Sequence, residues 1–199
     1  MLTGYILAGG NSSRMGRDKA FLPAGKVTLV ELVAARLRPL VEDLHVIGHA
    51  GNVERLRALA PPVGPVVLED FRPGCGPLMG VYTGLMHAVT PLSVFVPCDM
   101  PWVQPGLIDL LAAACVDGAE VAACEVPGDG WHPFPLVCRS AALRTVGGLL
   151  DRDRRALRDL LATPGARVLT VSEPDLCRSF LNLNTPADHA RLVADAHAS

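Results

Sequence analysis

Lysine is scarce in this chain of 199 residues, where only Lys19 and Lys26 stand against sixteen arginines. The formal net charge is −2, so the chain lacks the basic excess that non-specific nucleic-acid binding requires. It also lacks an apolar run of the roughly 20 residues that cross a bilayer. Its first residues, MLTGYILAGG, have no cationic region and no long apolar stretch of a secretory signal. We therefore expect a cytoplasmic protein that binds neither nucleic acid nor a membrane.

The six cysteines form no CxxC pair, and none stands at zinc-finger spacing from a second ligand. Most lie in apolar segments such as VFVPC and EVAAC, so we expect small core residues in a reducing compartment. Half of the residues are hydrophobic and 19% are charged, which excludes a disordered chain. The length fits a single domain over residues 1–199.

Short apolar runs alternate with amphipathic segments along the chain. The apolar runs predict strands at 4–8, 45–48, 65–69, 92–97 and 119–126, and with a looser rhythm at 134–138 and 166–171. The intervening segments predict helices at 28–38, 53–60 and 105–115. A further helix is predicted after a turn at 73–80 and through Ala88, another between the last two strands, and a last one from Thr185. Continuous apolar strands that alternate with helices predict a mostly parallel sheet covered on both faces, the α/β class.

The segment LAGGNSSRMGRDK follows the first predicted strand directly. In open α/β sheets, ligands bind at the carboxyl ends of the strands. Gly9 and Gly10 allow backbone N–H groups to turn toward an anion, and Arg14 and Lys19 add two cations. This combination suits a phosphate chain. The spacing is neither that of a Walker A loop nor GxGxxG, which weighs against P-loop NTPases and nicotinamide oxidoreductases.

Two carboxylates close predicted strands. Asp99 ends the strand at 92–97, beside the predicted phosphate loop, and Mg²⁺ prefers one or two carboxylates plus substrate phosphates. We therefore predict that Asp99 is the metal ligand, with a turn cap before Pro101 as the alternative. Asp70 closes the strand at 65–69, where capping the next turn is the alternative to a role in ligand binding.

Further motifs follow in order along the chain. They are Leu68-Glu69-Asp70, Gly76-Pro77-Leu78-Met79-Gly80, Pro97-Cys98-Asp99-Met100-Pro101, His132-Pro133 and Phe180-Leu181-Asn182-Leu183-Asn184-Thr185. With the glycine loop, they resemble the molybdenum cofactor guanylyltransferases over nearly the whole chain. Wider relatives of that family include molybdopterin cytidylyltransferases and sugar-phosphate nucleotidyltransferases, and the motifs G-P-L-x-G and F-x-N-x-N-T favour the guanylyltransferase branch.

The resemblance implies a Rossmann-like three-layer α/β/α nucleotidyltransferase fold, with GTP bound by the N-terminal half and molybdopterin by the C-terminal half. It implies nucleotide binding by Leu7, Ala8, Gly9, Gly10, Lys19, Asp70 and Asp99, with Gly76 and Gly80 letting backbone groups approach the base. Arg14, Lys19 and Asp99 are then catalytic, and Asp99 holds Mg²⁺. His132, Asn182 and Asn184 are implied to receive the second substrate, whereas without the resemblance the two asparagines read as turn or cap residues.

The implied reaction is transfer of GMP from GTP to molybdenum-molybdopterin, with release of pyrophosphate. A CTP-dependent or sugar-phosphate transferase and a non-catalytic cofactor-delivery protein are the alternatives. We expect a monomer, in transient contact with proteins that supply molybdopterin or mature molybdoenzymes. The family often carries Asn after its second strand, where this chain has Gly48 and His49. An arginine cluster at 152–158 predicts a solvated helix face. Its pair Arg154-Arg155 loosely resembles a paired arginine of the family, and the resemblance implies a site for the acceptor phosphate as the alternative.

Overall fold

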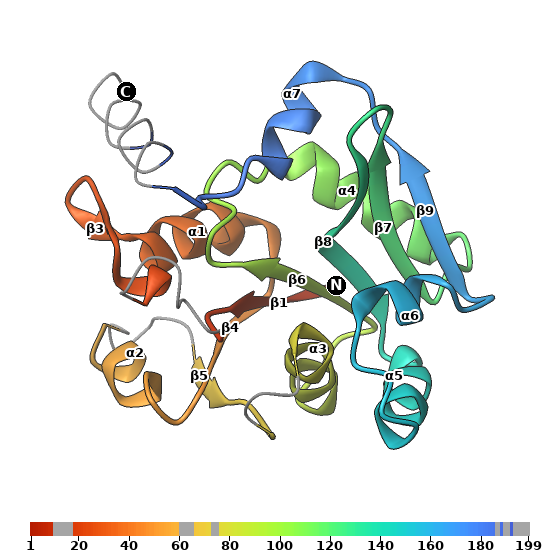
Figure 1. The fold of residues 1–199 in the computed structure, drawn as a ribbon, viewed down its shortest axis with the longest axis horizontal. Coiled ribbons are helices and arrows are strands. Elements are labelled where there is room, and N and C mark those ends of the chain that lie inside the picture. Colours follow the sequence, from red (N-terminus) through yellow and green to blue (C-terminus); the bar gives the residue numbers. More distant parts are fainter. Residues whose placement is uncertain (10–17, 60–65, 73–75, 186–187, 189–191, 193–199) are drawn as a thin grey trace.

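The computed structural model describes residues 1–9, 18–59, 66–72, 76–185, 188 and 192. Within these residues, a seven-stranded sheet crosses the molecule in the order β5-β4-β1-β6-β8-β7-β9 (Figure 1). Its strands are β1 (Leu2–Leu7), β4 (Asp43–Gly48), β5 (Val66–Glu69), β6 (Leu92–Pro97), β7 (Val121–Val126), β8 (Gly130–Arg139) and β9 (Ala166–Thr170). A separate hairpin pairs β2 (Pro23–Ala24) with β3 (Val27–Thr28).

Helices fill the connections between these strands. The α-helices are α1 (Leu29–Leu37), α2 (Val53–Leu59), α3 (Pro77–Met86), α4 (Pro105–Val116), α5 (Ala142–Asp151), α6 (Leu157–Leu161) and α7 (Pro174–Cys177). Short 3-10 helices are η1 (Lys19–Phe21), η2 (Arg38–Leu40) and η3 (Arg178–Phe180). None of the helices within the described residues has the length and apolar character needed to cross a membrane.

The sheet has two parts that differ in strand direction. In the parallel part, β5, β4, β1 and β6 all run the same way. In the mixed part, β8 runs antiparallel to β6 and β7, while β9 is parallel to β7. The mostly parallel sheet is therefore confirmed. The reversal of β8 follows from the short connection between Val126 and Gly130, because so few residues can join antiparallel strands only.

Strand residues alternate between two hydrophobic cores, as the two-residue period of a strand requires. Ile6 and Val94 pack with α1 and α4 on one face, whereas Tyr5 and Phe95 pack with α3 and α5 on the other. Figure 1 shows α1 and α4 on one side of the sheet and α3 and α5 on the opposite side. This confirms the expected three-layer α/β/α arrangement.

Two expected elements differ from the structure, and a third lies largely outside the described residues. The predicted turn at 73–80 is wrong at its end, because α3 begins at Pro77, and a proline fits the first helical turn, where its missing N–H costs nothing. The single arginine-rich helix is instead α5 and α6, with most of the arginine cluster in the connection between them. The predicted helix from Thr185 lies largely outside the described residues, although Thr185 and Asp188 exchange side-chain-to-backbone hydrogen bonds typical of a helix start.

The five cysteines within the described residues support the expected structural role, and Cys75 lies outside those residues. Cys98, Cys115, Cys124 and Cys138 are buried free thiols, and Cys177 is half-buried. Burial raises the pKa of the Cys115 thiol to about 11 and that of Cys124 to about 12. Such thiols stay protonated near neutral pH and behave as small apolar side chains.

Candidate active site

The residues that follow the parallel strands meet at one edge of the sheet. Backbone hydrogen bonds continue past the strand ends, from Ala8 N to Ile47 O (2.8 Å), from Asp70 N to Gly48 O (2.8 Å) and from Cys98 N to Leu7 O (3.0 Å). These bonds align the beginning of the glycine loop with the turns after β4, β5 and β6. The edge therefore carries the polar groups of four separate segments, as expected for a ligand site in an open α/β sheet.

Lys19 lies at the centre of the polar contacts at this edge. Its Nζ donates hydrogen bonds to Asp99 Oδ2 at 2.8 Å and to Asn184 Oδ1 at 2.9 Å. The side chains of Lys19 and Asp99 are only 19% and 23% exposed. Partial burial weakens solvent screening, so this ion pair concentrates one positive and one negative charge at the end of β6. The contact joins the motif after β1, the motif after β6 and the C-terminal motif.

The segment from Phe180 to Asn184 bridges the two parts of the sheet. Leu183 N donates to Asp99 O at 2.9 Å, which anchors the segment to the end of β6. Leu183 is fully buried, whereas Asn182 and Asn184 on either side of it are exposed. Asn184 thereby lies beside Lys19, which donates to its Oδ1. Asn182 is exposed two residues before it.

His132 reaches the same edge near the beginning of β8. Its ring stacks on Phe180, with 4.3 Å between the ring centroids. Its Nε2 lies 3.0 Å from Asp129 Oδ2 but outside hydrogen-bond geometry, so this buried nitrogen has no hydrogen-bond partner among the described residues. The Phe180 contact links the ring to the segment that carries both asparagines.

Asp70 forms a second polar group at the edge, held by α3. Thr83 Oγ1 donates to Asp70 Oδ1 at 3.0 Å and accepts a hydrogen bond from Phe71 N at 3.2 Å. Burial raises the pKa of the Asp70 carboxyl above its ordinary value, against the hydrogen bond from Thr83, which lowers it. The strand order places β4 and β1 between β5 and β6, so Asp70 and Asp99 lie at separate positions along the edge.

The two glycines of the G-P-L-M-G motif serve different purposes. Gly76 precedes α3 with a φ of 78°, a conformation that favours glycine. Gly80 lies inside α3, where a Cβ atom would come within 3.0 Å of Leu7 Cδ2. Its missing side chain lets α3 pack closely against the end of β1. That Gly76 and Gly80 let backbone groups approach the base stays a prediction.

Sequence reasoning missed two residues in this region, Asn52 and Asp18. Asn52 is 2% exposed, and its amide contacts His49, Ala8 and Asp18. Asparagine is common in turns, so the residue carried no distinguishing signal in the sequence. Asp18 was visible only as part of the loop motif, and its contact with Asn52 depends on the pairing of β1 with β4.

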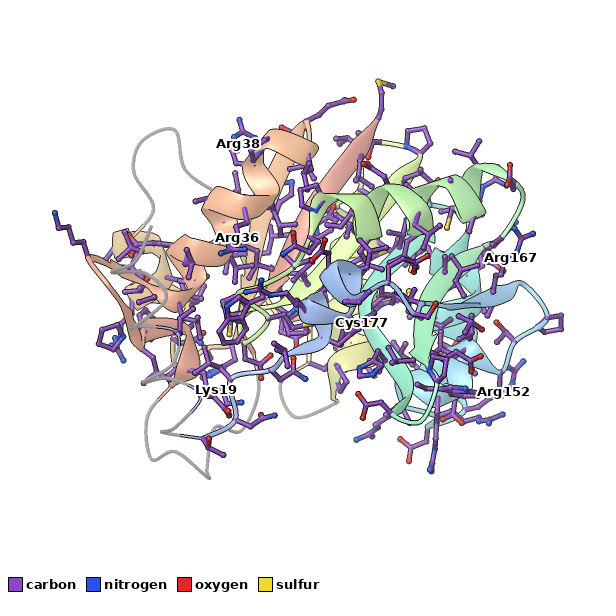
Figure 2. All side chains as sticks on the ribbon, turned by 90° about the horizontal axis from the view of Figure 1, so that it is seen from above. Lys19, Arg36, Arg38, Arg152, Arg167 and Cys177 are labelled. Carbon is purple, nitrogen blue, oxygen red and sulfur yellow. The ribbon has the colours of Figure 1, made fainter. Side chains whose placement is uncertain are left out.

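The structure therefore brings together Lys19, Asp99 and Asn184, and it places Leu7, Ala8, Gly9, Asp70 and His132 at the same edge of the sheet. Asn182 is exposed on the segment between Phe180 and Asn184. Gly10 and Arg14 lie outside the described residues. Arg152 is well separated from Lys19 in Figure 2. In the same cluster, Arg154 and Arg155 form exposed ion pairs with Asp159 and Asp153, both at 2.6 Å.

Within the described ranges, no group of three or more His, Cys, Asp or Glu side chains gathers to hold a metal ion. Asp99 offers a single carboxylate, and Lys19 bonds to its Oδ2. One carboxylate does not form a complete metal cage. It does match the donor set of Mg²⁺ in phosphate-transfer sites, where substrate phosphates and water supply the other ligands.

Comparison with known proteins identifies the class to which this fold and edge belong. A sequence model of the MobA-like NTP transferase domain matches residues 4–169. The structure of a molybdopterin-guanine dinucleotide biosynthesis protein A from Archaeoglobus fulgidus superposes with a TM-score of 0.81 at 20% identity, covering 99% of this chain and 100% of that one. A Mycobacterium tuberculosis protein solved in complex with manganese superposes with a TM-score of 0.69 at 20% identity, covering 97% and 98%. Both likenesses concern the fold.

Curated relatives narrow the class. The molybdenum cofactor guanylyltransferase of Serratia proteamaculans is 35% identical over 191 residues, which cover 96% of this chain and 93% of the relative. The molybdenum cofactor guanylyltransferase of Yersinia pestis is 36% identical over 190 residues, which cover 94% and 92%. The chain therefore belongs to the MobA-like NTP transferase family, among the molybdenum cofactor guanylyltransferases.

Proposed function

We propose that this protein transfers GMP from GTP to molybdenum-molybdopterin and releases pyrophosphate. The names of the curated relatives support this reaction and favour it over a cytidylyl or sugar-phosphate transfer. The observation that carries the proposal is the contact of Lys19 with both Asp99 and Asn184, at 2.8 and 2.9 Å. A cation from the phosphate loop thereby meets a strand-end carboxylate and an amide of the C-terminal motif, where a nucleotide and an acceptor have to meet.

In the proposed reaction, an oxygen of the acceptor's terminal phosphate attacks the α-phosphorus of GTP. A new bond forms between that oxygen and the phosphorus, and the bond to the bridging oxygen of the pyrophosphate group breaks. The electron pair leaves with pyrophosphate, so no enzyme nucleophile is needed. Such a reaction is accelerated by positioning and by neutralisation of charge. Lys19 supplies a mobile ammonium beside the reacting phosphates, and we assign Arg14 the same task.

Asp99 is the residue that would hold Mg²⁺, because its single carboxylate can be completed by the phosphates of the substrate. When bound, the ion neutralises charge on those phosphates. Gly9 and Gly10 would bind the triphosphate through backbone N–H groups, directly after Ala8, whose own N–H donates to Ile47 O. Asp70 would contact the nucleotide from the turn after β5.

The parallel part of the sheet and the loop after β1 are proposed to bind GTP, and the mixed part to bind molybdopterin. His132 supports the second assignment, since its ring stacks on Phe180 at the start of the segment that carries both asparagines. Asn182 and Asn184 add side-chain amides, which both donate and accept hydrogen bonds and so suit the edges of a pterin.

The test is to incubate the purified protein with GTP, Mg²⁺ and molybdenum-molybdopterin. The guanine dinucleotide and pyrophosphate are the expected products, in equal amounts, and chelation of Mg²⁺ with EDTA should stop their formation. Parallel reactions with CTP, ATP and UTP measure the base preference. A preference for CTP would overturn the choice of guanine, and nucleotide binding without pyrophosphate release would indicate a delivery protein in place of an enzyme.

A further inference from the structure

Asn52, in the turn between β4 and α2, is a buried polar residue to which the proposed reaction assigns no task. Its Oδ1 accepts a hydrogen bond from His49 N at 2.8 Å. Its Nδ2 donates to Ala8 O at 2.9 Å and to Asp18 Oδ2 at 2.7 Å. The acceptor and both donors of the amide are therefore engaged, and the His49 N–H fixes which way the amide faces.

The two groups that share the Asn52 amide flank the phosphate loop in the sequence. Ala8 directly precedes residues 9–17 and Asp18 directly follows them. Asp18 also accepts a hydrogen bond from Ala20 N through Oδ1, at 3.1 Å, and so caps the 3-10 helix η1 that begins at Lys19. A continuous path of hydrogen bonds thus runs from the end of β1, through Asn52 and Asp18, to the turn that carries Lys19.

Gly48 explains how the amide reaches this place. A Cβ atom at position 48 would lie 2.6 Å from both Asn52 Oδ1 and Leu56 Cδ1. Real Cβ contacts are not that short, so a side chain here would displace Asn52 from its three partners. The family resemblance leads one to expect Asn after the second strand. In this chain the residue at the strand end, Gly48, has no side chain, and the amide of Asn52, four residues further along, fills the space.

We propose that Asn52 is a positioning residue that holds both ends of the phosphate loop and, through Asp18, orients Lys19 for the triphosphate. It acts through the backbone at Ala8 and through Asp18, without contacting substrate. A site whose geometry is set before binding avoids the entropy cost of ordering itself around the ligand, so Asn52 strengthens nucleotide binding. This inference rests on the proposed function because it takes residues 8–19 as the nucleotide-binding segment.

The decisive variant is Asn52→Asp, which keeps the shape of the side chain and its acceptor for His49 N–H. It removes both donors and faces the Ala8 carbonyl and the Asp18 carboxylate with negative charge. We expect the Kd for Mg-GTP and the KM for GTP to rise about tenfold, the usual order for loss of a hydrogen bond to a charged group. The KM for molybdopterin should stay unchanged, whereas general damage to the fold would change both.

Two further variants separate the hydrogen bond from its surroundings. In the double variant Asp18→Asn/Asn52→Asp, amide and carboxylate exchange places, so a hydrogen bond between positions 18 and 52 can form again. The donor to Ala8 O stays missing, so we expect part of the lost affinity to return. Glu54→Gln is the matched control on α2, since Glu54 is exposed and pairs with Arg57 away from the loop. It should bind Mg-GTP like the unmodified protein.

Calorimetric titration with Mg-GTP, Mg-CTP, Mg-ATP and Mg-UTP accompanies the product assay. If the unmodified protein makes the dinucleotide and Asn52→Asp binds GTP equally well, the role of Asn52 is refuted while the function stands. If the protein binds a nucleotide but forms no product, the function fails and the affinities still decide on Asn52. No nucleotide binding at all would overturn both. Should Asn52→Asp not fold, Gly48→Ala displaces the amide without adding charge, and an unchanged Kd would then refute the proposal.

Discussion

The parallel and mixed parts of the sheet bring the proposed site residues to one edge by different routes. In the parallel part, Gly9, Asp70 and Asp99 each lie a few residues after the end of a strand. In the mixed part, His132 reaches the edge near the beginning of β8, because that strand runs against its neighbours. Asn184 arrives from outside the sheet, on a segment anchored to the main chain of Asp99.

This difference shows that the proposed GTP site is built from short motifs that follow single strands. The proposed molybdopterin site depends on segments that are far apart in the sequence. A parallel strand places the residues that follow it at the carboxyl edge of the sheet, so the position of a short motif in the fold follows from the strand that precedes it. The mixed part depends on contacts between distant segments. Lys19 and Asn184 meet although they are 165 residues apart, and this contact is where the two parts join.

The largest expected effect is that of Lys19→Ala, which tests the contact through which the parallel and mixed parts of the sheet meet. We expect kcat to fall about 10²–10³-fold, as for removal of one preorganised charge-stabilising group from an active site. Lys26→Ala is the matched control, because Lys26 is the other lysine of the chain and lies exposed in the β2–β3 turn. Steady-state pyrophosphate release measures both. Unchanged turnover in Lys19→Ala would show that the two parts do not meet at this residue.

A glycine in a helix beside each part provides the second comparison. In α3, beside the parallel part, a Cβ at Gly84 would press on Cε1 of Phe95 and lie 3.1 Å from Tyr5 Cδ1, so Gly84→Ala should cost about 1–3 kcal/mol of unfolding free energy. In α5, beside the mixed part, a Cβ at Gly148 would meet Arg152 Nη1 at an ordinary 3.8 Å. Gly148→Ala should stabilise by up to about 1 kcal/mol. Urea unfolding measures both, and effects of equal sign would contradict the difference in packing.

Asn182→Ala tests whether substrate binding divides between the parts. The side chain is exposed, so the fold should tolerate its removal. We expect the KM for molybdopterin to rise about tenfold, as for loss of one or two hydrogen bonds to a charged ligand, while the KM for GTP stays the same. The two constants are read from initial rates with each substrate varied in turn. A larger change in the KM for GTP would place Asn182 on the nucleotide side.

Asp70→Asn is expected to have the smallest effect, on the pH dependence of stability. Because burial raises the pKa of Asp70 above its ordinary 3.8, the folded protein holds this proton to higher pH than the unfolded chain. The unfolding free energy therefore falls as the pH rises through that interval. The variant loses this dependence, so it should be more stable than the parent at neutral pH, and the difference should vanish below the ordinary pKa. Thermal unfolding across pH checks this, and a variant that is less stable at neutral pH would contradict it.

Much of the parallel part was predictable from local patterns. Apolar runs predict its strands, and the strand ends place the glycine loop and Asp99 at one edge of the sheet. The contact between Lys19 and Asp99 agrees with that placement. The reversal of β8 was not predicted, although the turn Pro127-Gly128-Asp129-Gly130 between two apolar runs is a hairpin signal. Gly80 was misplaced because glycine and proline mark both turns and helix starts.

The amino-acid sequence by itself determined the α/β class, the strand positions and the loop motif, because hydrophobic periodicity and glycine spacing are local properties of the chain. Only the tertiary structure decided that Asn184 reaches Lys19 and that Asn52 joins Ala8 to Asp18. These contacts depend on strand order and direction, which local periodicity does not specify. The amide of Asn52 occupies the space that a side chain at Gly48 would take. It reaches Ala8 from there because β4 pairs with β1.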